Sequence, residues 1–77
     1  MNIDVLFFGV LAEVTHTSVR HYSNVNSFGD LRLRIEDEFP QITHYNYRIA
    51  VNNEIMNSDP LLNDGDRISF LPPFTGG

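Results

Sequence analysis

The 77-residue sequence contains no cysteine and no lysine, and its five basic side chains are all arginines. Without cysteine, the chain has no thiol that could carry sulfur, form a thioester or make a disulfide. Without lysine, it has no Schiff-base nucleophile and no side-chain acceptor for an isopeptide bond. Small secreted domains usually depend on disulfides, so we expect a reducing, cytoplasmic location. If the chain carries a covalent group, the C-terminal carboxylate is the obvious place for it.

Long apolar runs and clustered positive charge are also missing. The longest apolar run, residues 5–8, is too short to span a membrane, and no signal-peptide pattern precedes it. Ten carboxylates against five arginines give a net charge of −5, whereas binding to nucleic acid needs clustered basic side chains. We therefore expect neither a membrane nor a nucleic acid among the partners.

The sequence offers no set of side chains for catalysis or for metal binding. His16, His21 and His44 lie in separate segments, and no cysteine or short-spaced carboxylate completes a metal shell. The acids at 36–38 point in different directions on a helix, which is typical of a solvated face. No glycine-rich phosphate loop is present. We expect no metal, no bound cofactor and no catalytic activity of the chain's own.

Period-two alternation of apolar residues predicts five short strands. Residues 2–8 and 19–23 are predicted to pair as a hairpin, with residues 9–18 as a long polar connection. The other strands are predicted at 47–52, 54–56 and 67–71.

One amphipathic helix is predicted between the two groups of strands. Ser27 is a suitable N-cap, and Asp30 follows three residues later, as the acid does in a capping box. Apolar side chains then recur at helical spacing: Phe28, Leu31, Ile35 and Phe39. Pro40 disfavours helical geometry at the residue before it, so we expect the helix to end there and residues 41–46 to form a polar loop.

This order of elements is that of a ubiquitin-like β-grasp. The fold is an α+β domain of two layers, in which one main helix covers one face of a mixed sheet of about four to five strands. We place the domain at residues 1–71 and an extended C-terminal tail at residues 72–77.

Strand alternation also predicts which apolar side chains stay outside the core. If the core strands direct Ile3, Val5, Phe7, Ile68 and Phe70 toward the helix, Phe8 and Leu71 lie on the uncovered face, with Ile55 or Met56 nearby. Large apolar side chains near the start of the tail indicate a surface for a partner. The alternative is that scattered exposed apolar residues have no function.

The tail itself is the strongest functional signal. Pro72 and Pro73 fix φ at about −65°, which predicts a stiff, extended arm. Gly76 and Gly77 have no Cβ, so the tip can enter a channel too narrow for side chains and present its carboxylate there. A carboxylate must be activated, for example as an acyl-adenylate, before it accepts sulfur or an amine. Since the chain has no visible ATP motif, a separate enzyme must supply that step; the alternative is a frayed, inert terminus.

Together these features resemble the MoaD-type small subunits of molybdopterin synthase, which are ubiquitin-like sulfur carriers related to ThiS. The resemblance covers nearly the whole chain. It rests on Val5-Leu6-Phe7-Phe8, the helix cap, Val51-Asn52, the turn at 60–66 and above all Phe70-Leu71-Pro72-Pro73-Phe74-Thr75-Gly76-Gly77. The Gly-Gly end is shared by ubiquitin-like proteins in general, but its combination with an aromatic residue and the double proline is specific for this branch. Thiamine-pathway carriers usually lack the double proline.

The resemblance implies a function and a set of partners. An ATP-dependent, ubiquitin-activating-like enzyme adenylates the C-terminal glycine, and a sulfurtransferase system converts it to a thiocarboxylate. The large subunit of molybdopterin synthase then takes the tail into its active site, where the sulfur passes to cyclic pyranopterin monophosphate. Two such transfers build the dithiolene of molybdopterin. The family assembly is a heterotetramer with a central dimer of large subunits.

The resemblance also assigns residues to these roles. By position, Gly77 is the sulfur carrier and Gly76 is the threaded tip. Phe8, Ile55 and Leu71 match the apolar docking surface of the family, and the partner is expected to contact Pro72, Pro73, Phe74 and Thr75 as well. The family usually has a smaller aliphatic residue in place of Phe74. This ring must therefore fit the groove that admits the tail, or the chain pairs with a specialised partner.

Other functions stay open at this point. The chain could carry sulfur for another pathway, such as thiamine, amino-acid or tungsten-cofactor synthesis, or it could be a ubiquitin-like protein modifier. It could also be an interaction module whose tail is inert.

Overall fold

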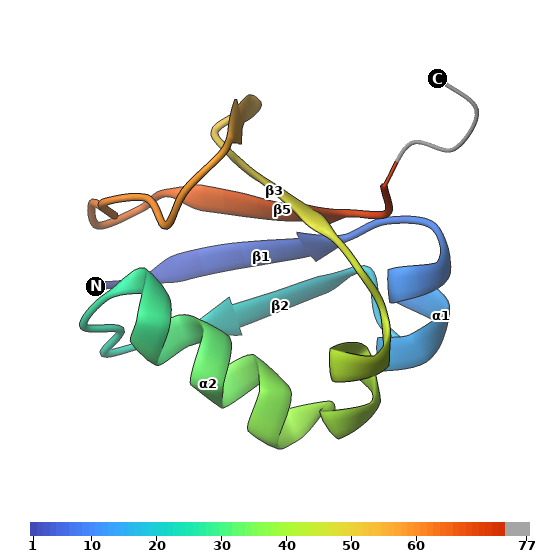
Figure 1. Cartoon of the computed structure of the whole chain (residues 1–77). Helices are drawn as coiled ribbons and strands as arrows, with labels where there is room; N and C mark the ends of the chain where they lie inside the picture. Colours follow the sequence, from blue (N-terminus) through green and yellow to red (C-terminus); the bar gives the residue numbers. More distant parts are fainter. Residues whose placement is uncertain (74–77) are drawn as a thin grey trace.

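The computed structural model describes residues 1–73, which form a five-stranded mixed sheet with helices on one of its faces (Figure 1). The strands are β1 (Ile3–Phe7), β2 (Val19–Tyr22), β3 (Arg48–Val51), β4 (Glu54–Met56) and β5 (Arg67–Leu71). Their order across the sheet is β2-β1-β5-β3-β4. Strands β1 and β5 are parallel, and every other neighbouring pair is antiparallel. The predicted β-grasp is confirmed. Within residues 1–73, no helix is long and apolar enough to cross a membrane.

The core lies between the sheet and helix α2 (Phe28–Glu38). The strand residues predicted to face the helix are all buried: Ile3, Val5, Phe7, Ile68 and Phe70. Phe28, Leu31 and Ile35 bury the facing side of α2, as predicted, while Phe39 is half-buried at its end. The rings of Phe7 and Phe70, on adjacent central strands, lie 5.5 Å apart. The two strands at the middle of the sheet therefore supply the centre of the core.

The prediction of a polar connection at 9–18 is wrong. This segment contains a short helix, α1 (Val10–Thr15), which buries Leu11 and Thr15. The Thr15 hydroxyl donates to the Leu11 carbonyl at 3.0 Å, and His16 ends the helix with φ at 58°. A helix of six residues makes fewer than two turns, so its apolar residues do not repeat often enough to show a helical period.

The prediction of a polar loop at 41–46 is also wrong. Residues Pro40–His44 form a 3₁₀-helix, η1, in which Ile42 is completely buried. Pro40 opens this helix, where its missing N–H costs no intrahelical hydrogen bond. The single apolar residue in this polar segment is therefore part of the core, and its burial holds the connection between α2 and β3 against the domain.

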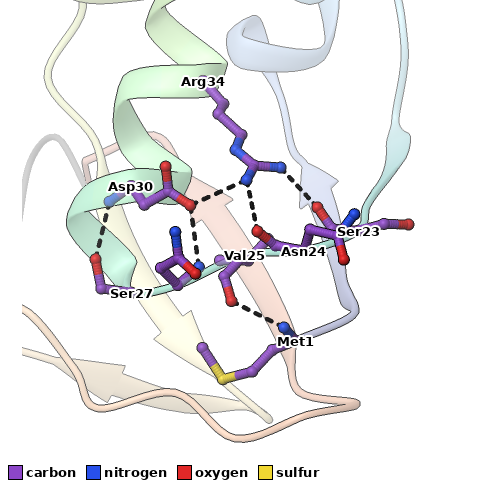
Figure 2. A network of polar contacts seen from close by, with 8 residues as sticks. Met1, Ser23, Asn24, Val25, Ser27, Asp30 and Arg34 are labelled. Atoms are coloured by element: carbon purple, nitrogen blue, oxygen red, sulfur yellow. Dashed lines mark hydrogen bonds and ion pairs between the residues drawn. The ribbon is translucent and has the colours of Figure 1, made fainter.

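The start of α2 is held by a network of polar contacts (Figure 2). The Ser27 hydroxyl accepts from the Asp30 amide at 3.1 Å, which confirms the predicted cap. The Asp30 carboxylate accepts from the Asn26 amide at 3.0 Å, one residue before the position that a capping box uses. It also pairs with Arg34 at 3.2 Å. The Asn26 hydrogen bond, assisted by Arg34, lowers the pKa of the Asp30 carboxyl.

Arg34 and Met1 extend this network to the segment before the helix (Figure 2). The Arg34 guanidinium donates to the carbonyls of Ser23 and Asn24, each at 2.6 Å. The amino group of Met1 donates to the Val25 carbonyl at 2.8 Å, and the Val25 amide donates to the Met1 carbonyl at 2.9 Å. The connection from β2 to α2 is thus fixed to both neighbouring elements, which sets the position of the helix over the sheet.

The lowered pKa of Asp30 predicts an acid-dependent contribution to stability. Its folded-state pKa lies below the unfolded value of about 3.9, so the ionised group stabilises the fold above that pH. The contribution is lost as pH falls through the folded pKa. Thermal unfolding followed by circular dichroism should therefore show Asp30→Asn below the wild type at neutral pH, with a smaller difference near about pH 2. An equal difference at both pH values would contradict this origin; Asp37→Asn, on the same helix, is the control.

Phe70 should be one of the most sensitive core positions, because its ring is completely buried and contacts both Phe7 and Tyr47. Phe70→Ala removes that ring and leaves a cavity, so the free energy of unfolding should fall by about 3–5 kcal/mol. Urea denaturation measures this value. A loss below about 1 kcal/mol would mean that the ring is not packed as described.

Candidate functional site

The face of the sheet that α2 leaves uncovered carries a row of side chains crossing all five strands. Strand register places these five in line: Val19, Leu6, Ser69, Ala50 and Ile55. Val19 and Ile55, at the two ends of the row, are 54% and 42% exposed. Ser69 and Ala50, in the middle, are small and covered by their neighbours. The row is therefore a largely apolar strip on a face that no described helix covers.

Two further apolar side chains lie beside this row, at the end of the sheet where the tail begins. Leu71 is half-buried and ends β5, opposite Arg48 of β3. Phe8 is 44% exposed, and its amide donates to the Phe70 carbonyl at 3.1 Å. This bond continues the pairing of β1 with β5, so alternation directs Phe8 to the same side as Leu6. We call this surface the apolar face: Leu6, Phe8, Val19, Ile55 and Leu71.

The structure decides between Ile55 and Met56. Ile55 pairs with Ala50 on the apolar face, whereas Met56 pairs with Ile49 and packs against the core on the other side. The sequence prediction for this surface omits Val19 and Leu6. Alternation in the first strand already separates Leu6 from Val5 and Phe7, but Val19 enters the surface only because β2 pairs with β1 in the observed register.

The root of the tail is held against the turn that follows β1. Gly9 has φ of +56°, and a Cβ built on it would lie 3.0 Å from Cγ of Pro72. The absence of a side chain at Gly9 therefore lets the Pro72 ring approach closely. Pro72 is half-buried and Pro73 is exposed. Figure 1 shows α1, which follows Gly9, at the same end of the sheet as the end of β5. The tail leaves the domain from a fixed position beside Phe8 and Leu71.

The remaining predicted site residues lie outside the part of the chain that the structure describes. These are Phe74, Thr75, Gly76 and Gly77. Their predicted roles stay predictions, and the structure places only the base from which they extend.

Several ionisable side chains in the described part of the chain make structural contacts. His21 pairs with Asp4 across β1 and β2 at 2.8 Å, and residues 1–73 contain no group of three potential metal ligands. Glu38 pairs with Arg20 and accepts from the Tyr22 hydroxyl at 2.6 Å. Burial raises the pKa of Tyr22 and of Tyr47 above the ordinary value, further from neutrality. These contacts are structural, whereas the candidate site is the apolar face beside the start of the tail.

Comparison with known proteins identifies a family and relatives of the same fold. The model of the family described as "ThiS family" matches residues 5–77. The molybdopterin synthase sulfur carrier subunit of Mycobacterium tuberculosis is 28% identical over 82 residues, which cover 100% of this chain and 99% of that protein.

Solved structures of similar fold include two that can be compared over nearly the whole chain. A chain in the complex of subunits 1 and 2 of molybdopterin-converting factor from Helicobacter pylori matches with a TM-score of 0.75 and 28% identity. The match covers 100% of this chain and 100% of that chain. Small archaeal modifier protein 1 from Methanosarcina acetivorans matches with a TM-score of 0.82 and covers 99% of this chain and 96% of that one. At 23% identity, this second likeness shows the shared fold alone.

The exposure of the apolar face predicts that its residues contribute little to stability. Ile55→Ser exchanges a side chain that is 42% exposed, so the free energy of unfolding should fall by about 1 kcal/mol or less. Urea denaturation beside Phe70→Ala provides the comparison within one experiment. If Ile55→Ser costs as much as the core variant, Ile55 is not a surface residue.

Proposed function

Because this chain belongs to the ThiS family, we propose that it carries sulfur in the synthesis of the molybdenum cofactor. Its C-terminal Gly77 is the carrier, and the large subunit of molybdopterin synthase is the partner that receives the sulfur. The relative from Mycobacterium tuberculosis and the Helicobacter pylori complex support this choice of pathway and partner. The chain is the non-catalytic subunit of this synthase.

The observation that carries the proposal is the position of the apolar face relative to the tail. Phe8 and Leu71 flank the point where Pro72 is held against Gly9, and Ile55 continues the same surface across the sheet. A partner that covers this surface therefore meets the root of the tail at the edge of the interface. Docking fixes one end of a stiff arm, so its tip is delivered to a defined place.

Loading of Gly77 takes two steps, both on partner enzymes. An oxygen of the carboxylate attacks the α-phosphorus of ATP, a new phosphorus–oxygen bond forms, and pyrophosphate leaves. A sulfide equivalent from the sulfurtransferase then attacks the acyl carbon, and AMP leaves with its bridging oxygen. The product is a thiocarboxylate. This chain contributes only the acyl group, which agrees with its lack of a phosphate-binding loop.

Transfer occurs in the active site of the large subunit. The thiocarboxylate sulfur forms a bond to an oxygen-bearing side-chain carbon of cyclic pyranopterin monophosphate, and the bond from that carbon to oxygen breaks. Water then attacks the acyl carbon of Gly77 and breaks its bond to sulfur. The sulfur stays on the pterin, and Gly77 returns to a carboxylate. Each dithiolene holds two sulfur atoms, so two loaded chains must act in turn on the same pterin.

The absence of cysteine allows a sharp test of loading. The chain is co-produced with its activating enzyme and sulfurtransferase, treated with iodoacetamide and measured by intact-mass spectrometry. A thiocarboxylate should take up one alkyl group, and a variant lacking Gly76 and Gly77 should take up none. Alkylation matters because oxidation of either of the two methionines changes the mass almost as much as replacement of oxygen by sulfur. An unalkylated chain from an active loading system would contradict the proposal.

The same experiment separates the alternatives. If the chain is a protein modifier, C-terminal adducts on lysines of other proteins should appear in place of the alkylated carrier. If it serves another sulfur pathway, the alkylated carrier should form but its sulfur should not reach cyclic pyranopterin monophosphate in the presence of the large subunit.

Because Gly76 has no Cβ, we expect Gly76→Ala to impair sulfur transfer without unfolding the domain. A methyl group at this position obstructs the narrow channel, so transfer should slow by roughly one to two orders of magnitude. The core residues all precede Pro72, so the midpoint of thermal unfolding should stay at the wild-type value. Transfer to the pterin and thermal unfolding are measured on the same preparation. A marked loss of thermal stability would mean that the tail belongs to the folded domain.

A further inference from the structure

The five arginines divide between the two sides of the sheet. Three of them pair with carboxylates around α2: Arg20 with Glu38, Arg32 with Asp59 at 3.8 Å, and Arg34 with Asp30 at 3.2 Å. The other two, Arg48 and Arg67, form no ion pair with any carboxylate in residues 1–73. Both are exposed.

Both unpaired arginines occupy the side of the sheet that bears the apolar face. Arg48 lies opposite Leu71, and Arg67 lies beside Asp4, so strand alternation directs each away from α2. The Arg48 guanidinium donates to the Asn57 side chain at 3.0 Å. The backbone of Arg67 is bonded on both sides to Asn52, whose amide oxygen accepts from the Arg67 amide at 3.0 Å. The guanidinium of Arg48 and the backbone of Arg67 are therefore held in place.

The chain as a whole is acidic, but this side of the sheet is not. Its strand positions carry a single carboxylate, Asp4, which pairs with His21 at 2.8 Å. Two arginines and one carboxylate leave a charge of +1 with His21 neutral, on a chain whose net charge is −5. Most of the remaining carboxylates lie on α2 and in the loops. The charge at the strand positions of this side therefore has the opposite sign to the net charge of the chain.

The two arginines also bracket the apolar row. Arg67 opens β5 and Leu71 closes it, with Arg48 beside Leu71 on the next strand. Four residues of strand separate the two ends by about 13 Å. Leu6, Ser69 and Ala50 lie between them. A complementary surface must cover an apolar strip and meet one positive charge on each side of it.

We propose that the large synthase subunit is acidic where it docks, with carboxylates facing Arg48 and Arg67 on either side of an apolar patch. This inference rests on the proposed function and specifies the partner of the same site. Attraction to the two arginines accelerates docking of the apolar face. Repulsion by the carboxylates around α2 disfavours approach from the other side, so the tail arrives correctly oriented.

The test measures association of the carrier with the large subunit encoded in the same genome, by biolayer interferometry at low and high salt. Wild-type association should slow as salt rises. Arg48→Glu and Arg67→Glu should each slow association several-fold at low salt, and the double variant by at least about tenfold, with a weaker dependence on salt. Arg67→Gln, which places no new carboxylate beside Asp4, should show a smaller loss in the same direction.

Arg32→Glu is the matched control, because it changes the net charge by the same amount on the α2 side of the sheet. It should leave association within about twofold of the wild type, because Arg32 lies on α2, away from the apolar face. Thermal unfolding of each variant verifies that it is folded.

If all three single reversals slow association equally, only net charge matters and the inference is wrong. If Arg48→Glu and Arg67→Glu bind like the wild type while Leu71→Ser does not, the inference fails but the proposed function stands. If the wild-type chain itself does not bind the large subunit, the proposed function fails and this inference with it.

Discussion

The parallel pairing of β1 with β5 is the interaction on which the rest of the molecule depends. It joins strands from opposite ends of the sequence at the middle of the sheet, where it places Phe7 next to Phe70 in the core. The same register continues one residue further through the bond between Phe8 and Phe70. It thereby aligns Gly9 with Pro72 and fixes the start of the tail. Folding of the core and positioning of the tail are consequences of one ladder of hydrogen bonds.

The two faces of the sheet differ: one packs against α2 to form the core, and the other carries the candidate docking surface. One face buries the large apolar side chains under α2, where three arginines pair with carboxylates around the helix. The other face keeps an apolar strip and two unpaired arginines available. In the proposed function, the chemistry takes place at the tail and on the proteins that act on it. The domain would then bind the partner and extend the tail toward it, while the partners would activate the carboxylate and transfer the sulfur.

Most of the fold follows from local patterns in the sequence. Alternation of apolar residues predicts all five strands to within one or two residues of their observed bounds, and it predicts those of β5 without error. The Ser27 cap and Pro40 predict the two ends of α2. The errors are α1 and η1, which are too short for a periodic pattern and depend on burying Leu11 and Ile42 against elements distant in sequence. The surface near the tail could be predicted in part, because alternation separates Phe8 and Leu71 from the core. Val19, the choice of Ile55 over Met56, and the positive charge of this face depend on which strands are neighbours. Net charge and local pattern do not carry that information.

A single-turnover transfer of labelled sulfur tests the central claim most directly. The chain, loaded with ³⁵S at its C-terminus, is mixed with the large subunit and cyclic pyranopterin monophosphate, and the label is followed in protein and pterin. The account predicts that the label leaves the chain and appears in the pterin product, while the chain regains an ordinary carboxylate. Label that stays on the chain, or leaves it without entering the pterin, would contradict the proposal that Gly77 delivers sulfur to this cofactor.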